Sequence, residues 1–99
     1  MHEKILVNEL LKIPNAIIID LRDTKDFESG HIPNAINISA EKLRREPQKY
    51  LNKKRVYYLY CQFGISSSKT CSYLYDNGYE VIDVVEGYEG FLLEKNKKV

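Results

Sequence analysis

Residues 16–19 (Ala-Ile-Ile-Ile) constrain the fold more than any other segment, because these four consecutive apolar residues lie between Pro14-Asn15 and Asp20. An uninterrupted apolar run of this length between turn signals is typical of a strand that is covered on both faces. A sheet open to water on one side would instead alternate apolar and polar residues. The sequence therefore predicts an α/β fold with a sheet buried between helices.

Strand and helix patterns alternate along the chain, and short loops separate them. The predicted strands are 16–20, 35–38, 56–60 and 80–85, and the predicted helical segments are 7–12, 24–29, 39–45, 47–51, 67–77 and 88–95. Gly30 ends segment 24–29, and Gly78 is expected in the left-handed position that follows helix 67–77. This alternation implies a mostly parallel sheet flanked by helices on both faces.

Composition limits the partners and the compartment. The 99 residues, 1–99, suit a single domain, and no repeat or linker divides them. With 15 Lys and Arg against 14 Asp and Glu, the net charge of +1 gives no basic surface for nucleic acid, and no apolar run approaches a membrane span. The two cysteines are too few for a disulfide framework and lack the spacing of a zinc site. We expect a cytoplasmic protein that binds neither nucleic acid nor membranes.

The loop 61–66, with the sequence CQFGIS, is the predicted site of chemistry, because Cys61 directly follows strand 56–60. The carboxyl end of a buried strand faces the crevice where open α/β sheets bind ligands. The next helix directs its free N–H groups and the positive end of its dipole at this loop, a setting that favours the nucleophilic thiolate. From these residues alone, Cys61 is either this nucleophile or a small buried residue that ends the strand.

Three segments resemble the rhodanese family. Residues 20–37 (DLRDTKDFESGHIPNAIN) are similar to the N-terminal signature of rhodanese domains, loop 61–66 is similar in placement and length to the active-site loop, and residues 87–91 (GYEGF) resemble the C-terminal glycine-rich, aromatic motif. They occur in the family's order and are distributed over most of the stretch from residue 16 to residue 92. The resemblance implies a rhodanese-like α/β fold, with a five-stranded, mostly parallel sheet flanked by helices on both faces.

The resemblance also implies a sulfurtransferase or persulfide carrier whose catalytic cysteine is Cys61. The sulfur donor would be a small molecule or a protein persulfide, the acceptor would be cyanide or a thiol, and neither a metal nor an organic cofactor would be required. Backbone N–H groups of the loop, arranged as a nest, would stabilise the sulfur anions. The predicted substrate contacts are Gln62, Phe63, Gly64, Ile65, Ser66 and Ser67. The hydroxyls of the two serines are further expected to cap the helix.

Two other functions compete with this interpretation. A dual-specificity phosphatase is disfavoured, because the position at which its loop ends in a phosphate-binding arginine is Ser67 here. The alternative that stays open is a non-catalytic rhodanese-like module that binds a partner or senses oxidants. Because loop 61–66 contains no cation, the sequence also predicts weak use of doubly charged thiosulfate and better sulfur loading from less charged persulfides or polysulfides.

The remaining candidates in the first motif are expected to be structural. By the resemblance, His31 orders the turn between a helix and a strand, and Asn34 occupies a left-handed turn position. Asp20 and Arg22 are expected to pair and brace neighbouring loops. Asp26 is expected to pair with Arg22 from one helical turn away.

Cys71 is predicted to be a core residue rather than a redox partner of Cys61. It falls on the apolar stripe of helix 67–77. The helical rise of about 1.5 Å per residue carries Cys71 more than a turn away from the loop. A disulfide would require the two sulfurs to approach within about 2 Å of each other.

Overall fold

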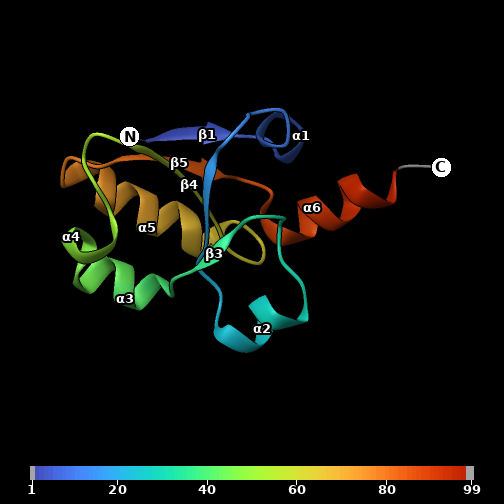
Figure 1. Ribbon diagram of the computed structural model, residues 1–99, viewed down its shortest axis with the longest axis horizontal. Helices are drawn as coiled ribbons and strands as arrows, with labels where there is room; N and C mark the ends of the chain where they lie inside the picture. The colour runs from blue at the N-terminus through green and yellow to red at the C-terminus, as the bar shows by residue number, and fades with distance from the viewer. Residues whose placement is uncertain (1, 98–99) are drawn as a thin grey trace.

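The computed structural model describes residues 2–97, which form a parallel sheet with helices packed on both faces (Figure 1). The strands are β1 (Glu3–Ile5), β2 (Ile17–Asp20), β3 (Ile36–Asn37), β4 (Val56–Tyr60) and β5 (Glu80–Val84). Their order across the sheet is β1-β5-β4-β2-β3, and each neighbouring pair is parallel. The predicted α/β fold class with a five-stranded sheet is therefore confirmed, and the sheet is all-parallel.

Helices cover both faces of the sheet. They are α1 (Val7–Leu10), α2 (Thr24–Ser29), α3 (Ala40–Arg45), α4 (Pro47–Tyr50), α5 (Ile65–Asp76) and α6 (Gly87–Asn96). Helices α3, α4 and α5 lie over one face, α1 and α6 lie over the other, and α2 lies beside the carboxyl ends of the strands (Figure 1). Within residues 2–97, no helix is both long and apolar enough to cross a membrane.

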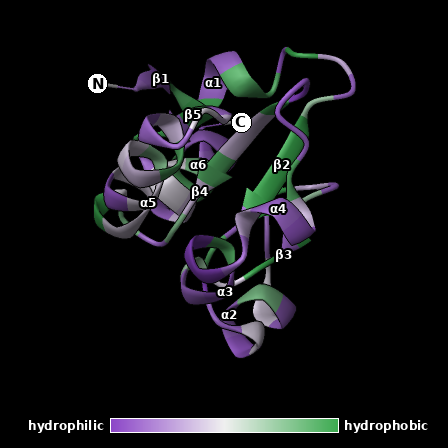
Figure 2. Ribbon diagram, turned by 90° about the vertical axis from the view of Figure 1, so that its left-hand side faces the viewer, coloured by the Kyte–Doolittle hydropathy of each residue, from purple (hydrophilic) through white to green (hydrophobic). Residues whose placement is uncertain are grey.

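Two hydrophobic layers hold the helices to the sheet, because successive strand residues point to opposite faces. Ile19 and Leu59 pack with Leu43 and Leu74 beneath α3 and α5. On the other face, Ile18 and Tyr60 pack in the layer that contains Val7, Leu10 and Phe91. In Figure 2, β2 is coloured mostly hydrophobic, whereas most of α3 and α4 is coloured hydrophilic. A sheet buried in this way has continuous apolar strands, as the sequence of β2 predicts.

Several element boundaries differ from the predictions. Strand β1 was not predicted, because Glu3–Ile5 has no apolar run and gains its place only by pairing with Ile82 to Val84 of β5. The helix predicted over 7–12 ends at Leu10, and the helix predicted over 67–77 already begins at Ile65.

Smaller shifts affect the other predicted segments. The strand predicted over 35–38 is reduced to 36–37, and helix α6 begins at Gly87, one residue earlier than expected. The left-handed conformations expected at Asn34 and Gly78 are present, with φ angles of 71° and 91°.

Candidate active site

Cys61 lies immediately after β4, the middle strand of the sheet, and its side chain is buried within the loop that leads into α5. The backbone N–H groups of Gly64 and Ser67 donate to Cys61 Sγ at N···S distances of 3.1 and 3.2 Å. Gly64 makes this curvature possible with a φ of 98°, and a Cβ atom at this position would collide with the carbonyl oxygen of Val85. The loop therefore surrounds the sulfur with peptide dipoles whose positive ends face it.

The predicted contact residues separate into two groups. Gln62, Phe63, Ile65 and Ser66 line the same hollow as Cys61, which has a volume of about 350 Å³. Gly64 and Ser67 contribute backbone N–H groups to the sulfur instead of side chains to the hollow.

The expected capping of α5 by a serine hydroxyl is wrong. Gly64 is the N-cap residue and has no side chain, while Ser66 is exposed. The Ser67 hydroxyl is fully buried and donates to Asp83 Oδ1 at 2.7 Å, while the Gly64 carbonyl oxygen lies 3.3 Å from its Oγ. On its other side, Asp83 Oδ2 lies 3.4 Å from Nε2 of His2. Ser67 thus connects the amide that touches the sulfur to a buried carboxylate on β5.

The N-terminus of α6 holds the other side of the loop. The N–H of Tyr88 donates to the carbonyl oxygen of Cys61 at 2.8 Å, and the N–H of Glu89 donates to that of Gln62 at 3.1 Å. Gly87 permits this approach, because its φ is 63° and a Cβ atom there would lie 2.6 Å from the Cys61 carbonyl oxygen. The sequence motif 87–91 indicated that this segment matters, but the contacts themselves depend on the fold.

Arg22, two residues past the end of β2, braces the loop as expected and pairs with Asp20. Its Nη2 lies 2.8 Å from Asp20 Oδ2, and both side chains are buried. The same guanidinium donates to the Gly30 carbonyl oxygen and, at 3.0 Å, to Oε1 of Gln62. The Gln62 amide in turn donates to Glu89 at 2.9 Å. The side chain of Gln62 is therefore engaged in holding the loop between two charged neighbours.

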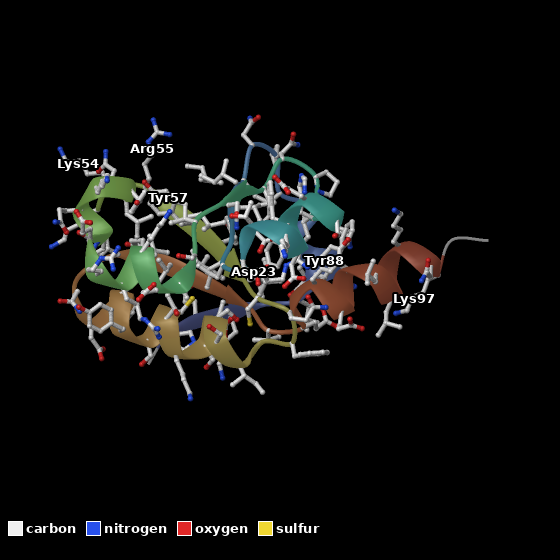
Figure 3. All side chains as sticks on the ribbon, turned by 90° about the horizontal axis from the view of Figure 1, so that it is seen from below. Asp23, Lys54, Arg55, Tyr57, Tyr88 and Lys97 are labelled. Atoms are coloured by element: carbon white, nitrogen blue, oxygen red, sulfur yellow. The ribbon has the colours of Figure 1, made fainter. Side chains whose placement is uncertain are left out.

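The expected pair between Asp26 and Arg22 is wrong. Arg22 is directed toward Asp20 instead, and the carboxylate of Asp23 caps α2 by accepting from the backbone N–H of Asp26 at 3.0 Å. The Arg22 guanidinium also lies 4.1 Å from the ring centroid of Tyr88, which is labelled with Asp23 in Figure 3. Lys54 and Arg55 lie at the opposite, amino end of β4 in the same view, far from this site.

His31 has the structural contacts expected of it. Its Nδ1 lies 2.8 Å from the carbonyl oxygen of Phe27, and the two rings stack with centroids 3.8 Å apart. These contacts fix the turn between α2 and β3. His31 does not line the hollow at Cys61.

Cys71 is fully buried in the layer beneath α3 and α5, together with Leu74 and Val81. Burial raises the pKa of its thiol far above the ordinary value, and the negative charges of Asp83 and Cys61 act in the same direction. A thiol that stays protonated is a poor nucleophile. Within residues 2–97, no three potential metal-ligating side chains cluster around either cysteine or elsewhere.

The cysteine lies at the carboxyl end of the middle strand of a parallel sheet, inside a loop whose N–H groups converge on its sulfur. This arrangement defines an α/β protein whose candidate site is centred on a cysteine sulfur. The profile of the rhodanese-like domain matches residues 5–94, and the chain belongs to this family.

Relatives and solved structures agree with this assignment. The thiosulfate sulfurtransferase GlpE of Coxiella burnetii is 35% identical over 82 residues, covering 82% of this chain and 76% of GlpE. A tRNA uridine(34) hydroxylase of Buchnera aphidicola is 34% identical over 99 residues and covers 92% of this chain, but the chain spans only 31% of that protein. The crystal structure of a rhodanese-related protein from Thermoplasma volcanium has a TM-score of 0.86 at 28% identity, covering 94% of this chain and 93% of that one.

Proposed function

We propose that the protein is a sulfurtransferase that carries a sulfane sulfur on Cys61 as a persulfide. The observation that carries the proposal is the pair of backbone N–H groups, from Gly64 and Ser67, that donate to Cys61 Sγ. Such a nest stabilises negative charge on sulfur without a charged side chain. The similarity to a thiosulfate sulfurtransferase supports the same chemistry.

In the first step, the Cys61 thiolate attacks the outer sulfur of the donor. The new S–S bond forms as the bond between that sulfur and the donor breaks, and the donor leaves with the electron pair as a thiolate or as sulfite. The product is a persulfide anion on Cys61. The N–H groups that donate to the thiolate remain available to donate to this second anion.

In the second step, a thiol or cyanide attacks the outer sulfur of the persulfide. The S–S bond to Cys61 breaks, and Cys61 regains its electron pair as a thiolate. No electrons are gained or lost over the cycle, so neither step needs an external oxidant or reductant. The donor is a small molecule or a protein persulfide, and the acceptor is a thiophile.

Intact-mass measurement tests the proposal. The protein is incubated with thiosulfate, a polysulfide or a cysteine persulfide, and then treated with cyanide or a thiol. We expect the wild type and Cys71→Ala to gain the mass of one sulfur atom and to release it, whereas Cys61→Ser gains none. Circular dichroism establishes that both variants are folded.

Absence of loading from all three donors in the folded wild type would overturn the proposal. A non-catalytic module that binds a partner or senses oxidants would then be the better explanation of the site. Equal loss of loading in folded Cys61→Ser and Cys71→Ala would instead favour a mechanism that uses both thiols.

A further inference from the structure

One cation lines the hollow at Cys61, although loop 61–66 contains none. Lys69 follows Ile65 by four residues in α5, and residues at this spacing lie side by side on one helix face. Of the described residues that line the hollow, Lys69 is the single charged one, since the others are Cys61, Gln62, Phe63, Ile65 and Ser66. An anion that enters this hollow therefore meets one positively charged side chain among its lining residues.

The walls beside Lys69 are apolar and exposed. Phe63 and Ile65 keep 66% and 70% of their surface in contact with solvent, more than the other large hydrophobic residues that are exposed among residues 2–97. Both side chains line the hollow that contains Cys61. Inorganic thiosulfate has two charges and no apolar surface, so it would leave these walls uncovered. A donor with an apolar group would cover them and displace water.

We propose that Phe63 and Ile65 select sulfur donors that carry an apolar organic group beside the anionic sulfur, such as organic persulfides and thiosulfonates. This inference rests on the proposed sulfurtransferase function and names its donor class. The apolar group contacts Phe63 and Ile65, and Lys69 attracts the anionic end. The outer sulfur is then brought to Cys61, which lines the same hollow.

The reaction with a thiosulfonate is balanced. The Cys61 thiolate attacks the outer sulfur of R–SO₂–S⁻, and the S–S bond of the donor breaks. The electron pair leaves on the sulfinate R–SO₂⁻, and Cys61 becomes a persulfide anion. Benzenethiosulfonate and thiosulfate are suitable probes, because both deliver one sulfane sulfur but differ in charge and in apolar surface.

The test compares second-order rate constants for sulfur loading of Cys61, measured by intact mass. We expect the wild type to favour benzenethiosulfonate over thiosulfate by about tenfold or more, the discrimination that a partly open apolar wall provides. Phe63→Ser and Ile65→Ser should each lower this ratio several-fold. Lys69→Gln should slow loading from thiosulfate more than from benzenethiosulfonate and reduce the salt dependence of both.

Two control variants match these changes outside the hollow. Leu93→Ser removes a hydrophobic side chain that is 65% exposed on α6, and Lys54→Gln removes a cation at the amino end of β4 (Figure 3). Neither should change the ratio. Equal rate constants for both donors, or a ratio that neither Phe63→Ser nor Ile65→Ser lowers, would overturn the donor preference while leaving the sulfurtransferase intact. Failure of both donors to load Cys61 would instead overturn the proposed function itself.

Discussion

At the scale of single residues, Gly87 is a position where a side chain would disturb the sulfur-binding loop directly. Its φ of 63° strains any residue with a Cβ, and that atom would lie 2.6 Å from the carbonyl oxygen of Cys61 and 2.7 Å from that of Gln62. We expect Gly87→Ala to lower the free energy of unfolding by more than the roughly 1–2 kcal/mol of left-handed strain alone. Sulfur loading should slow as well, because the loop must move away. Urea denaturation and intact-mass kinetics measure the two effects.

Gly78→Ala is the matched control for this prediction. Gly78 has a φ of 91°, so alanine is strained there too, but its Cβ would meet only the flexible end of Lys53 at 3.4 Å. We expect Gly78→Ala to lower the free energy of unfolding by about 1 kcal/mol and to leave the rate of sulfur loading unchanged. Equal effects of the two substitutions on loading would contradict the role assigned to Gly87.

Ser67 and its neighbour Ser66 are expected to differ sharply in their effect on stability. The buried Ser67 hydroxyl donates to Asp83, so Ser67→Ala leaves a buried carboxylate oxygen without that donor. The expected loss is about 1–3 kcal/mol in the free energy of unfolding. Ser66 is exposed, and Ser66→Ala should change stability by less than about 0.5 kcal/mol. Similar losses in both variants by thermal denaturation would show that the contact with Asp83 contributes little.

At the scale of elements, Arg22 connects the end of β2, the end of α2 and the loop after β4. Its partner Asp20 is fully buried, so Arg22→Met leaves a buried carboxylate without its cation. We expect Arg22→Met to lower the free energy of unfolding by about 3–5 kcal/mol. Arg45→Met is the control, because the Arg45–Glu46 pair has an N···O distance of 4.0 Å and both side chains are largely exposed. Urea denaturation should show that Arg45→Met lowers the free energy of unfolding by no more than about 1 kcal/mol. Comparable losses would contradict the bracing role of Arg22.

The sequence predicts those elements whose formation depends on local pattern. Strands β2 and β4 and helix α3 follow from apolar runs, turn residues and the cap at Ser39. Strand β1 escaped prediction because its three residues are stabilised by pairing with β5, almost eighty positions away in the chain. Likewise, α5 begins earlier than its serines suggest, because Gly64 makes the turn and the Ser67 hydroxyl turns inward to Asp83.

The features of the candidate site also divide into those that follow from local sequence and those that depend on distant contacts. Cys61 and the amide nest are accessible to prediction, because a strand, a glycine-containing loop and a helix follow one another in sequence. The contacts that the α6 N–H groups make with the loop carbonyls could not be predicted, since they join segments more than 25 residues apart. Lys69 was missed for a different reason, because it lies outside the loop and reaches the hollow only through the helical turn that begins at Ile65.

At the scale of the whole molecule, two buried groups make the free energy of unfolding depend on pH in the alkaline range. Burial raises the pKa of Cys71 from its ordinary 9.0, and burial together with the hydrogen bond to Asp20 raises the pKa of Tyr60 from its ordinary 10.0. In the unfolded chain both groups lose their protons at these ordinary values, while the folded protein keeps them. Above each value the unfolded state binds fewer protons, so the free energy of unfolding must fall as the pH rises.

The contribution of Cys71 is measurable by comparison with Cys71→Ala. Between about pH 9 and pH 10, the wild type should lose about 1 kcal/mol more of its free energy of unfolding than the variant, because the variant has no thiol to ionise when it unfolds. Below about pH 8 the two pH profiles should run parallel, since the thiol is protonated in both states. Urea denaturation at closely spaced pH values provides these profiles.

Parallel profiles up to pH 10 would mean that the Cys71 thiol ionises in the folded protein as easily as in the unfolded chain. Water would then have to reach a side chain that is fully buried between the sheet and α5. In that case, iodoacetamide would also alkylate Cys71 in the folded Cys61→Ser variant at pH 9. We expect instead that Cys71 of this variant is alkylated only after urea is added. A steeper pH profile for the wild type, together with alkylation of Cys71 only in urea, would leave Cys61, which lines the hollow, as the one cysteine that is open to sulfur donors in the folded protein.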